Sequence, residues 1–200
     1  SATDTDVANL VVSGSINPAN MLNVETVNGT AKYGSVTFDG SKFIGTKTFN
    51  FDSAIASGNA EVTSNAATAI AAKNNISTLK VTNGAAGATV AVDAGAATSV
   101  TATGAAGADV FTVTLAAGTN TVAIDGNAGT DAYTLNLKGG TLALTASSAN
   151  NETLALNVST GAQTINVAGT TGLSKATTVA GDQNVTIKGD EAGFDTFTMT

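Results

Sequence analysis

The chain alternates apolar with small or polar residues in short runs, and this pattern recurs along its length. From residue 77 onward the runs come in pairs, and each pair flanks a turn rich in Gly, Asn, Asp and Ser. Alternation with period two indicates strands that bury one face. The turns follow Gly-x-x-Gly-x-Asp or a degenerate form of it, in six copies that begin 20 to 22 residues apart, at 84–89, 104–109, 126–131, 147–152, 169–174 and 190–195.

This fixed period predicts a stack of similar units, an all-β parallel β-solenoid (β-helix) with coils of about 21 residues. One coil cannot bury its apolar side chains alone, so neighbouring coils must stack about 4.8 Å apart. Residues 77–200 are predicted to form the regular solenoid, and residues 1–76 less regular β coils continuous with it. We expect a segment of a longer protein, because the last residues have the pattern of a strand.

Two further structural features are predicted. Residues 65–73 are rich in Ala and are expected to form a short helix, with Asn65 as its N-cap. The second position after each acidic turn residue is expected to form one stacked ladder, which comprises Ala91, Phe111, Tyr133, Leu154, Ala176 and Phe197. Core packing explains the aromatic members of this ladder, so they are assigned no binding role.

The composition restricts the chemistry of the chain. Its net charge is −7, all eight basic residues are Lys, and it has no Cys or His. Nucleic-acid partners and anionic membrane surfaces are disfavoured, because Arg and clustered Lys make the phosphate contacts. No apolar run approaches the roughly 20 residues of a membrane span, so no membrane insertion is expected. The common nucleophile–base pairs are missing, and we expect no enzymatic activity; paired carboxylates are the remaining catalytic option.

Two turns with their following strands resemble the RTX nonapeptide, Gly-Gly-x-Gly-x-Asp-x-apolar-x, at residues 104–112 and 126–134; residues 190–198 match it more loosely. In the RTX family, turn carbonyls and the Asp carboxylate bind Ca²⁺ between neighbouring coils. Ca–O distances of about 2.3–2.6 Å place two opposed ligands roughly 5 Å apart, which is close to the coil spacing. The resemblance implies calcium as a cofactor, with ligands from Asp109, Asp131, Asp195 and Glu152 and from the turn carbonyls of Gly107 and Gly129.

A metal-free interpretation of these turns stays open. The leading Gly-Gly is reduced to one Gly, and three of the six copies carry Asp at the acidic position. The period also exceeds the roughly 18 residues of paired nonapeptides. In this interpretation the acidic residues are solvated turn residues, and the turn glycines adopt a positive φ.

Degenerate RTX turns, repeats rich in Ala, Thr, Gly, Val and Asn, and phrases such as Asn-Val-Glu-Thr-Val-Asn at residues 23–28 resemble the surface-layer (S-layer) proteins of Gram-negative bacteria. This resemblance implies type I secretion, an extracellular location on the bacterial cell surface, and calcium-assisted self-assembly into a lattice. In that family an N-terminal domain usually attaches to lipopolysaccharide. The resemblance therefore implies lipopolysaccharide as a partner only through a region outside this chain.

Two alternatives from other functional classes stay open. A large RTX-type adhesin would use the same solenoid as a stalk, with its binding site elsewhere. An ice-binding solenoid is suggested by Thr-x-Thr pairs, which occur at Thr101/Thr103, Thr112/Thr114 and Thr196/Thr198. Ice binding needs such a pair at one register on every coil, and residues 132–137 and 153–158 break that register.

Overall fold

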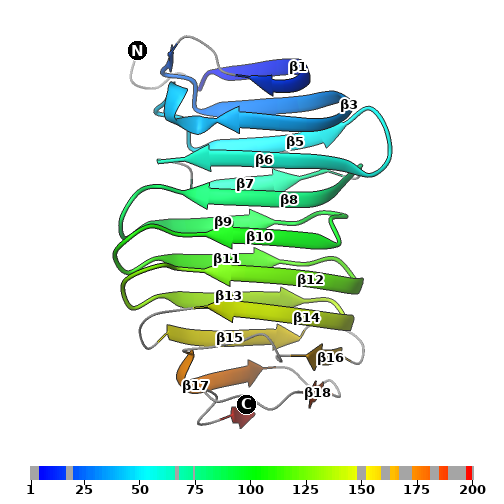
Figure 1. Cartoon of the computed structure of the whole chain (residues 1–200), viewed down its shortest axis with the longest axis vertical. Coiled ribbons are helices and arrows are strands. Elements are labelled where there is room, and N and C mark those ends of the chain that lie inside the picture. Colours follow the sequence, from blue (N-terminus) through cyan, green and yellow to red (C-terminus); the bar gives the residue numbers. More distant parts are fainter. Residues whose placement is uncertain are drawn as a thin grey trace.

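The computed structural model describes residues 5–16, 20–65, 68–73, 75–147, 152–158, 163–166, 173–180, 185–188 and 197–199. The strands lie across the long axis of the molecule and stack along it, with β1 at one end and β19 at the other (Figure 1). One short 3₁₀ element among the described residues, η1 (Gly40–Lys42), interrupts them. The strands are β1 (Val7–Ile16), β2 (Met21–Leu22), β3 (Thr26–Asp39), β4 (Phe43–Ile44), β5 (Thr48–Ser53), β6 (Gly58–Ser64), β7 (Ala69–Ala72), β8 (Ile76–Asn83), β9 (Thr89–Asp93), β10 (Ser99–Thr103), β11 (Val110–Thr114), β12 (Gly118–Asp125), β13 (Ala132–Leu137), β14 (Gly140–Ser147), β15 (Glu152–Val158), β16 (Gln163–Asn166), β17 (Leu173–Ala180), β18 (Val185–Lys188) and β19 (Phe197–Met199).

Every strand pair in the described part of the chain is parallel, and seventeen strands join one continuous sheet. This sheet winds around the core and forms two walls of the solenoid, which we call the first face and the second face. The first face stacks the N-terminal halves of β1 and β3 and then the odd-numbered strands β5 to β19. The second face stacks the C-terminal halves of β1 and β3 and then β6 and the even-numbered strands β8 to β18. The predicted parallel β-solenoid, with coils about 21 residues apart, is confirmed.

The first two coils turn from one face to the other within a single long strand. Gly14 in β1 and Gly34 in β3 have φ values of 95° and 93° at these corners. The β1–β3 register shifts between Val12 and Gly14, where the strand bends. Gly is suited to both corners because it adopts a positive φ without a steric penalty.

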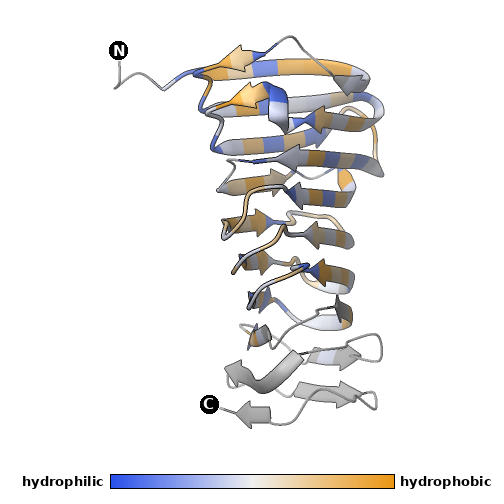
Figure 2. Cartoon of the chain, turned by 60° about the vertical axis from the view of Figure 1, so that its left-hand side comes forward, coloured by the Kyte–Doolittle hydropathy of each residue, from blue (hydrophilic) through white to orange (hydrophobic). Residues whose placement is uncertain are grey.

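The core lies between the two faces and consists of columns of stacked side chains. Hydrophobic and hydrophilic residues alternate along the strands (Figure 2), as period-two patterning requires. A buried column on the first face contains Val27, Phe49, Ile70, Val92, Val113, Leu135 and Leu156. A buried column on the second face contains Phe38, Val62, Val81, Ala102 and Ile124. Each coil thus covers the apolar side chains of its neighbours.

A cluster of four phenylalanines lies among the aliphatic residues in the core of the N-terminal coils. Phe38 contacts three other buried Phe rings, with ring centroids 5.3 to 6.2 Å away, from Phe43, Phe49 and Phe51. Gly29 makes room for this cluster, since an added Cβ would lie 2.6 Å from the ring of Phe38. A residue without a side chain is therefore required opposite the large ring.

The predicted helix at 65–73 is wrong. Ala69–Ala72 form strand β7, which pairs with β5 and β9, and its residues alternate between half-buried and buried. Alanine favours helices, but an isolated helix of this length is marginal in water. Stacking between two neighbouring coils therefore decides the conformation.

The predicted side-chain ladder is partly wrong in its register. Phe111, Tyr133 and Leu154 stack as predicted. The preceding member is Val90 rather than Ala91, and the following member is Thr177 rather than Ala176. The first shift arises because Thr89 lies in strand β9 and not in the turn. The second arises because the β15–β17 register shifts between Glu152 and Leu154.

The strands pair across the predicted boundary at residue 76. β6 pairs with β8, and β7 pairs with β9, both in parallel. Coils on the two sides of residue 76 thus belong to one sheet.

Candidate functional site

The described Gly-x-x-Gly turns lie one above another at the same edge of the solenoid. They connect β8 to β9, β10 to β11 and β12 to β13, and we call them the turn stack (residues 84–88, 104–109 and 126–131). The second Gly of each turn, at Gly87, Gly107 and Gly129, has a φ of 66°, 116° and 147° respectively. The prediction that turn glycines adopt a positive φ is confirmed for the second Gly of each turn and is wrong for the first, at Gly84, Gly104 and Gly126.

Asp109 is buried inside the turn stack, with 0 % of its surface exposed. Its Oδ2 accepts a hydrogen bond from the N–H of Ala105 in its own turn, at 2.8 Å. Its Oδ1 accepts from the N–H of Ala88 in the neighbouring turn, at 2.7 Å. N–H groups that point at a carboxylate stabilise its charge and replace the water lost on burial. Asp109 therefore joins two coils through its side chain.

Asp131 repeats this arrangement one coil further along. It is 1 % exposed, and its Oδ1 accepts from the N–H of Asp109 at 2.7 Å. Beside it the hydroxyl of Tyr133 accepts from the N–H of Gly126 at 2.9 Å. Each turn carboxylate thus binds the backbone of the turn before it. The solvated turn acids of the metal-free interpretation are ruled out at Asp109 and Asp131, since both are buried.

The first Gly of each turn is explained by the carboxylate. An added Cβ at Gly104 would collide with Oδ2 of Asp109, and one at Gly126 would collide with Oδ2 of Asp131. Neither position has a positive φ, so steric contact rather than backbone conformation excludes a side chain there. The spacing of five residues between the first Gly and the Asp follows from this contact.

Asn127 occupies the place of the second Gly in the RTX pattern. It has a φ of 66°, and its Nδ2 donates to the carbonyl of Gly104 in the neighbouring turn at 2.7 Å. Its own N–H donates to Oδ1 of Asp125 at 3.0 Å. An amide side chain thus binds a turn carbonyl of the neighbouring coil.

The donor set around Asp109 does not match a calcium site, and at Asp131 one carboxylate oxygen already accepts from an N–H. Calcium takes six to eight oxygen ligands. Here both oxygens of Asp109 face N–H donors, and the predicted carbonyl ligand of Gly107 lies against the Cα of Gly129. In the part of the chain that the structure describes, no three carboxylate, His or Cys side chains are grouped closely enough to hold a metal ion. Asp195 and the side chain of Glu152 lie outside the described residues, and calcium binding there stays a prediction.

The outer surface of the first face carries a ladder of amide side chains that the sequence patterns missed. Asn28 Nδ2 donates to Asn9 Oδ1 at 2.7 Å, and Asn50 Nδ2 donates to Asn28 Oδ1 at 2.8 Å. The same ladder resumes further along, where Asn157 Nδ2 donates to Asn136 Oδ1 at 2.9 Å. The column, which we call the amide ladder, contains Asn9, Asn28, Asn50, Ala71, Asp93, Thr114, Asn136 and Asn157. Thr-x-Asn at residues 26–28, 48–50 and 134–136 was the available signal.

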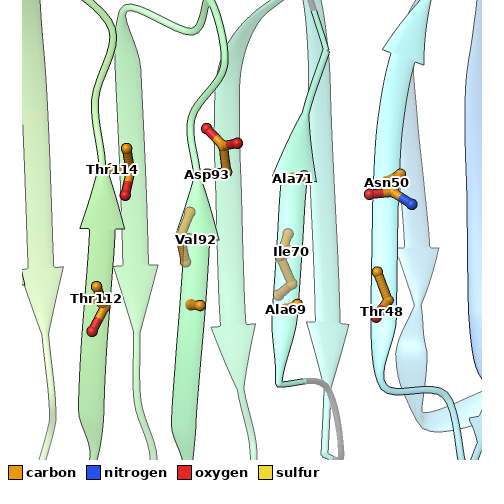
Figure 3. Close-up of a pocket in the computed structure, with 10 residues that line it drawn as sticks. Thr48, Asn50, Ala69, Ile70, Ala71, Val92, Asp93, Thr112 and Thr114 are labelled. Carbon is orange, nitrogen blue, oxygen red and sulfur yellow. The ribbon is translucent and has the colours of Figure 1, made fainter. Parts of the chain in front are cut away.

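The first face is hollowed where the amide ladder is interrupted (Figure 3). A shallow groove of about 150 Å³ crosses β7 and β9, with the small side chains of Ala69, Ala71 and Ala91 in its wall. Thr48 and Asn50 border it on β5, and Thr112 and Thr114 on β11. Asp93 is the charged residue of the lining. The groove follows from small residues in two adjacent coils.

Comparison of the chain with protein-family models, with curated proteins and with solved structures finds no match. A search of the described residues for a helix long and apolar enough to cross a membrane found none. The functional interpretation therefore depends on the fold, on the turn stack and on the sequence resemblance.

Proposed function

We propose that this chain is a structural segment of a bacterial surface-layer lattice protein, exported to the cell surface, where copies assemble with one another. The observation that carries the proposal is that polar side chains in the turns bind the backbone of neighbouring coils. Asp109, Asp131 and Asn127 each bind a neighbouring coil. These three turn side chains thus hold neighbouring coils together, which suits a structural element of a lattice.

The surface chemistry of the described coils supports the same proposal. The outer columns consist mainly of Thr, Ser, Ala and Asn, and these present rows of short side chains. A row of this kind offers repeated contacts at the coil spacing of about 4.8 Å. Identical copies can match such rows over a long distance, as lateral packing in a lattice requires.

Calcium assistance is retained in the proposal at the C-terminal turns only. The turns at Asp109 and Asp131 are capped by N–H donors. Glu152 and Asp195, one and three turns further along, are the positions where calcium remains proposed. Carboxylates at these turns would suit a hard cation that prefers oxygen ligands.

Electron microscopy of the purified chain, in millimolar calcium and in excess chelator, tests the proposal. A lattice segment should form ordered two-dimensional sheets without any receptor. Rods without lateral order would favour the adhesin stalk. The absence of any assembly across a wide concentration range would contradict the lattice role.

Ice binding remains a second candidate because of one column on the first face. Thr26, Thr48, Thr112 and Thr134 stand at the same register on their coils. Ala69 and Ala91 interrupt this column, and Asn136 replaces the second Thr of the pair next to Thr134. A thermal-hysteresis assay that gives zero would remove this candidate.

A further inference from the structure

The groove on the first face is as wide as two coils. Ala69, Ala71 and Ala91 line it on β7 and β9, and threonines border it on β5 and β11. Asp93 is exposed and lies in the same outward row as Ala71 (Figure 3). A side chain that enters the groove thus meets methyl groups and the carboxylate of Asp93. Lysine suits this lining, because it combines an apolar stem with a cationic end.

The second face carries two long side chains in neighbouring coils, Glu61 on β6 and Lys80 on β8, which we call the ridge. Lys80 Nζ donates to Glu61 Oε1 at 2.7 Å, and the two side chains are 50 % and 39 % exposed respectively. The next members of their column are the shorter Thr37 and Thr101. A hollow of about 230 Å³ also lies beside the pair. The ridge therefore projects from the second face and spans two coils, as the groove does.

The ridge and the groove lie at the same level of the solenoid, on opposite faces. Along the axis β8 lies between β7 and β9, the two central strands of the groove (Figure 1). Lys80 precedes the turn at 84–88 by four positions, and Asp93 follows it by five. Since β8 and β9 run in opposite directions on either side of this turn, both residues lie at a similar distance from the turn stack. A second copy displaced sideways, without rotation, therefore brings its Lys80 to the groove beside Asp93.

We propose that the groove receives the ridge of a second copy of this chain, so that copies associate side by side. This contact rests on the proposed lattice function and specifies one of its lateral interactions. Lys80 lies between Glu61 of its own chain and Asp93 of the neighbouring copy, and its stem covers the alanines of the groove. Copies repel one another on average, because the net charge of the chain is −7. A lysine between two carboxylates offsets this repulsion at the contact.

The contact joins two different surfaces, so it repeats from copy to copy. Each copy presents its groove to one neighbour and its ridge to another, and all copies keep the same orientation. A contact of this kind that does not close into a ring produces an open row. The row extends across the solenoid axis, as one direction of a two-dimensional lattice would. Salt screens the charges at the contact, so association should weaken as the ionic strength rises.

A charge swap tests the contact by sedimentation velocity over a wide protein concentration range. Lys80→Glu places a carboxylate against Asp93, and Asp93→Lys places an ammonium group against Lys80. Each variant alone should associate about tenfold more weakly than the parent chain, because like charges then meet. An equimolar mixture should associate about as strongly as the parent, since an alternating row again joins opposite charges at each contact. Lys73→Glu, at an exposed position outside the groove and the ridge, is the matched control for net charge and should associate as the parent does.

A larger side chain in the groove tests its shape. Ala91→Gln, at an exposed position of the lining, should weaken association about tenfold, whereas Ala96→Gln in an exposed turn of the same coil should not. Far-UV circular dichroism checks that each variant is folded, and where Asp93→Lys is not, Lys80→Glu against its control decides.

The possible outcomes separate the contact from the lattice function. If the mixture associates no more strongly than its components, or if Lys80→Glu associates as the parent does, the contact is wrong, although sheets formed by the parent leave the lattice function intact. A parent chain that stays monomeric at every concentration overturns both proposals. Rows without sheets would overturn the lattice function alone.

Discussion

The backbone N–H of Asp109 donates to Oδ1 of Asp131 over 2.7 Å, although the two residues are 22 positions apart in the sequence. The same bond joins Ala88 N–H to Asp109 Oδ1, 21 positions apart. The acidic residue of one coil thus satisfies a backbone donor of the coil before it. Coil stacking in this region depends on buried carboxylates as well as on the apolar columns.

Replacing Asp131 should destabilise the fold, because the backbone N–H of Asp109 loses its hydrogen-bond acceptor. Asp131→Ala leaves the buried N–H of Asp109 without this acceptor, which should cost about 1–3 kcal/mol in the free energy of unfolding. Asp131→Asn retains an acceptor oxygen and should cost less. Denaturant unfolding followed by far-UV circular dichroism measures both. Asp93→Ala is the control, since the exposed Asp93 caps the N–H of Gly95 where water can replace it; an equal loss at Asp93 would contradict the explanation.

Calcium should not change the effect of removing the buried carboxylates. The double variant Asp109→Ala with Asp131→Ala should lower the melting temperature by the same amount in millimolar calcium and in excess chelator, because N–H groups already bind both oxygens of Asp109 and Oδ1 of Asp131. Asp195→Ala is the comparison, and a calcium-dependent loss is predicted there. A loss at Asp109 and Asp131 seen only with calcium would show that these residues are ligands after all.

The steric explanation of the first turn glycine predicts a non-additive pair of substitutions. Gly126→Ala should destabilise the chain by about 1–3 kcal/mol, because its methyl group would collide with the carboxylate of Asp131. In an Asp131→Ala background the same substitution should cost clearly less. A double-mutant cycle from unfolding free energies measures the coupling. Additive losses would indicate that Gly126 is required for another reason.

The amide ladder should contribute modestly to stability. Asn28 both donates to Asn9 and accepts from Asn50, so Asn28→Ala removes two side-chain hydrogen bonds. Partly exposed bonds of this kind contribute about 0.5–1.5 kcal/mol each. Thr30→Ala, on the same strand and face, is the control for the loss of an outward polar side chain. Equal unfolding free energies for the two variants would show that the ladder adds no stability.

The candidate site was only partly predictable. The sequence identified the turn glycines and the acidic residues at Asp109 and Asp131, because the spacing of the motif is local. It did not predict that both carboxylates are buried and accept from N–H groups of a neighbouring coil. That outcome depends on how one turn lies over the next, which a single turn does not specify.

The sequence alone determined the strands of the regular repeats, the period of about 21 residues and the parallel stacking, because alternation and repetition are properties of the chain itself. The tertiary structure decided the register. It replaced Ala91 with Val90 in the core ladder, and it turned the alanines of β7 into a strand. It also aligned asparagines from separate coils into the amide ladder. These outcomes depend on the contact between coils, where a shift of one residue reverses which side chains are buried.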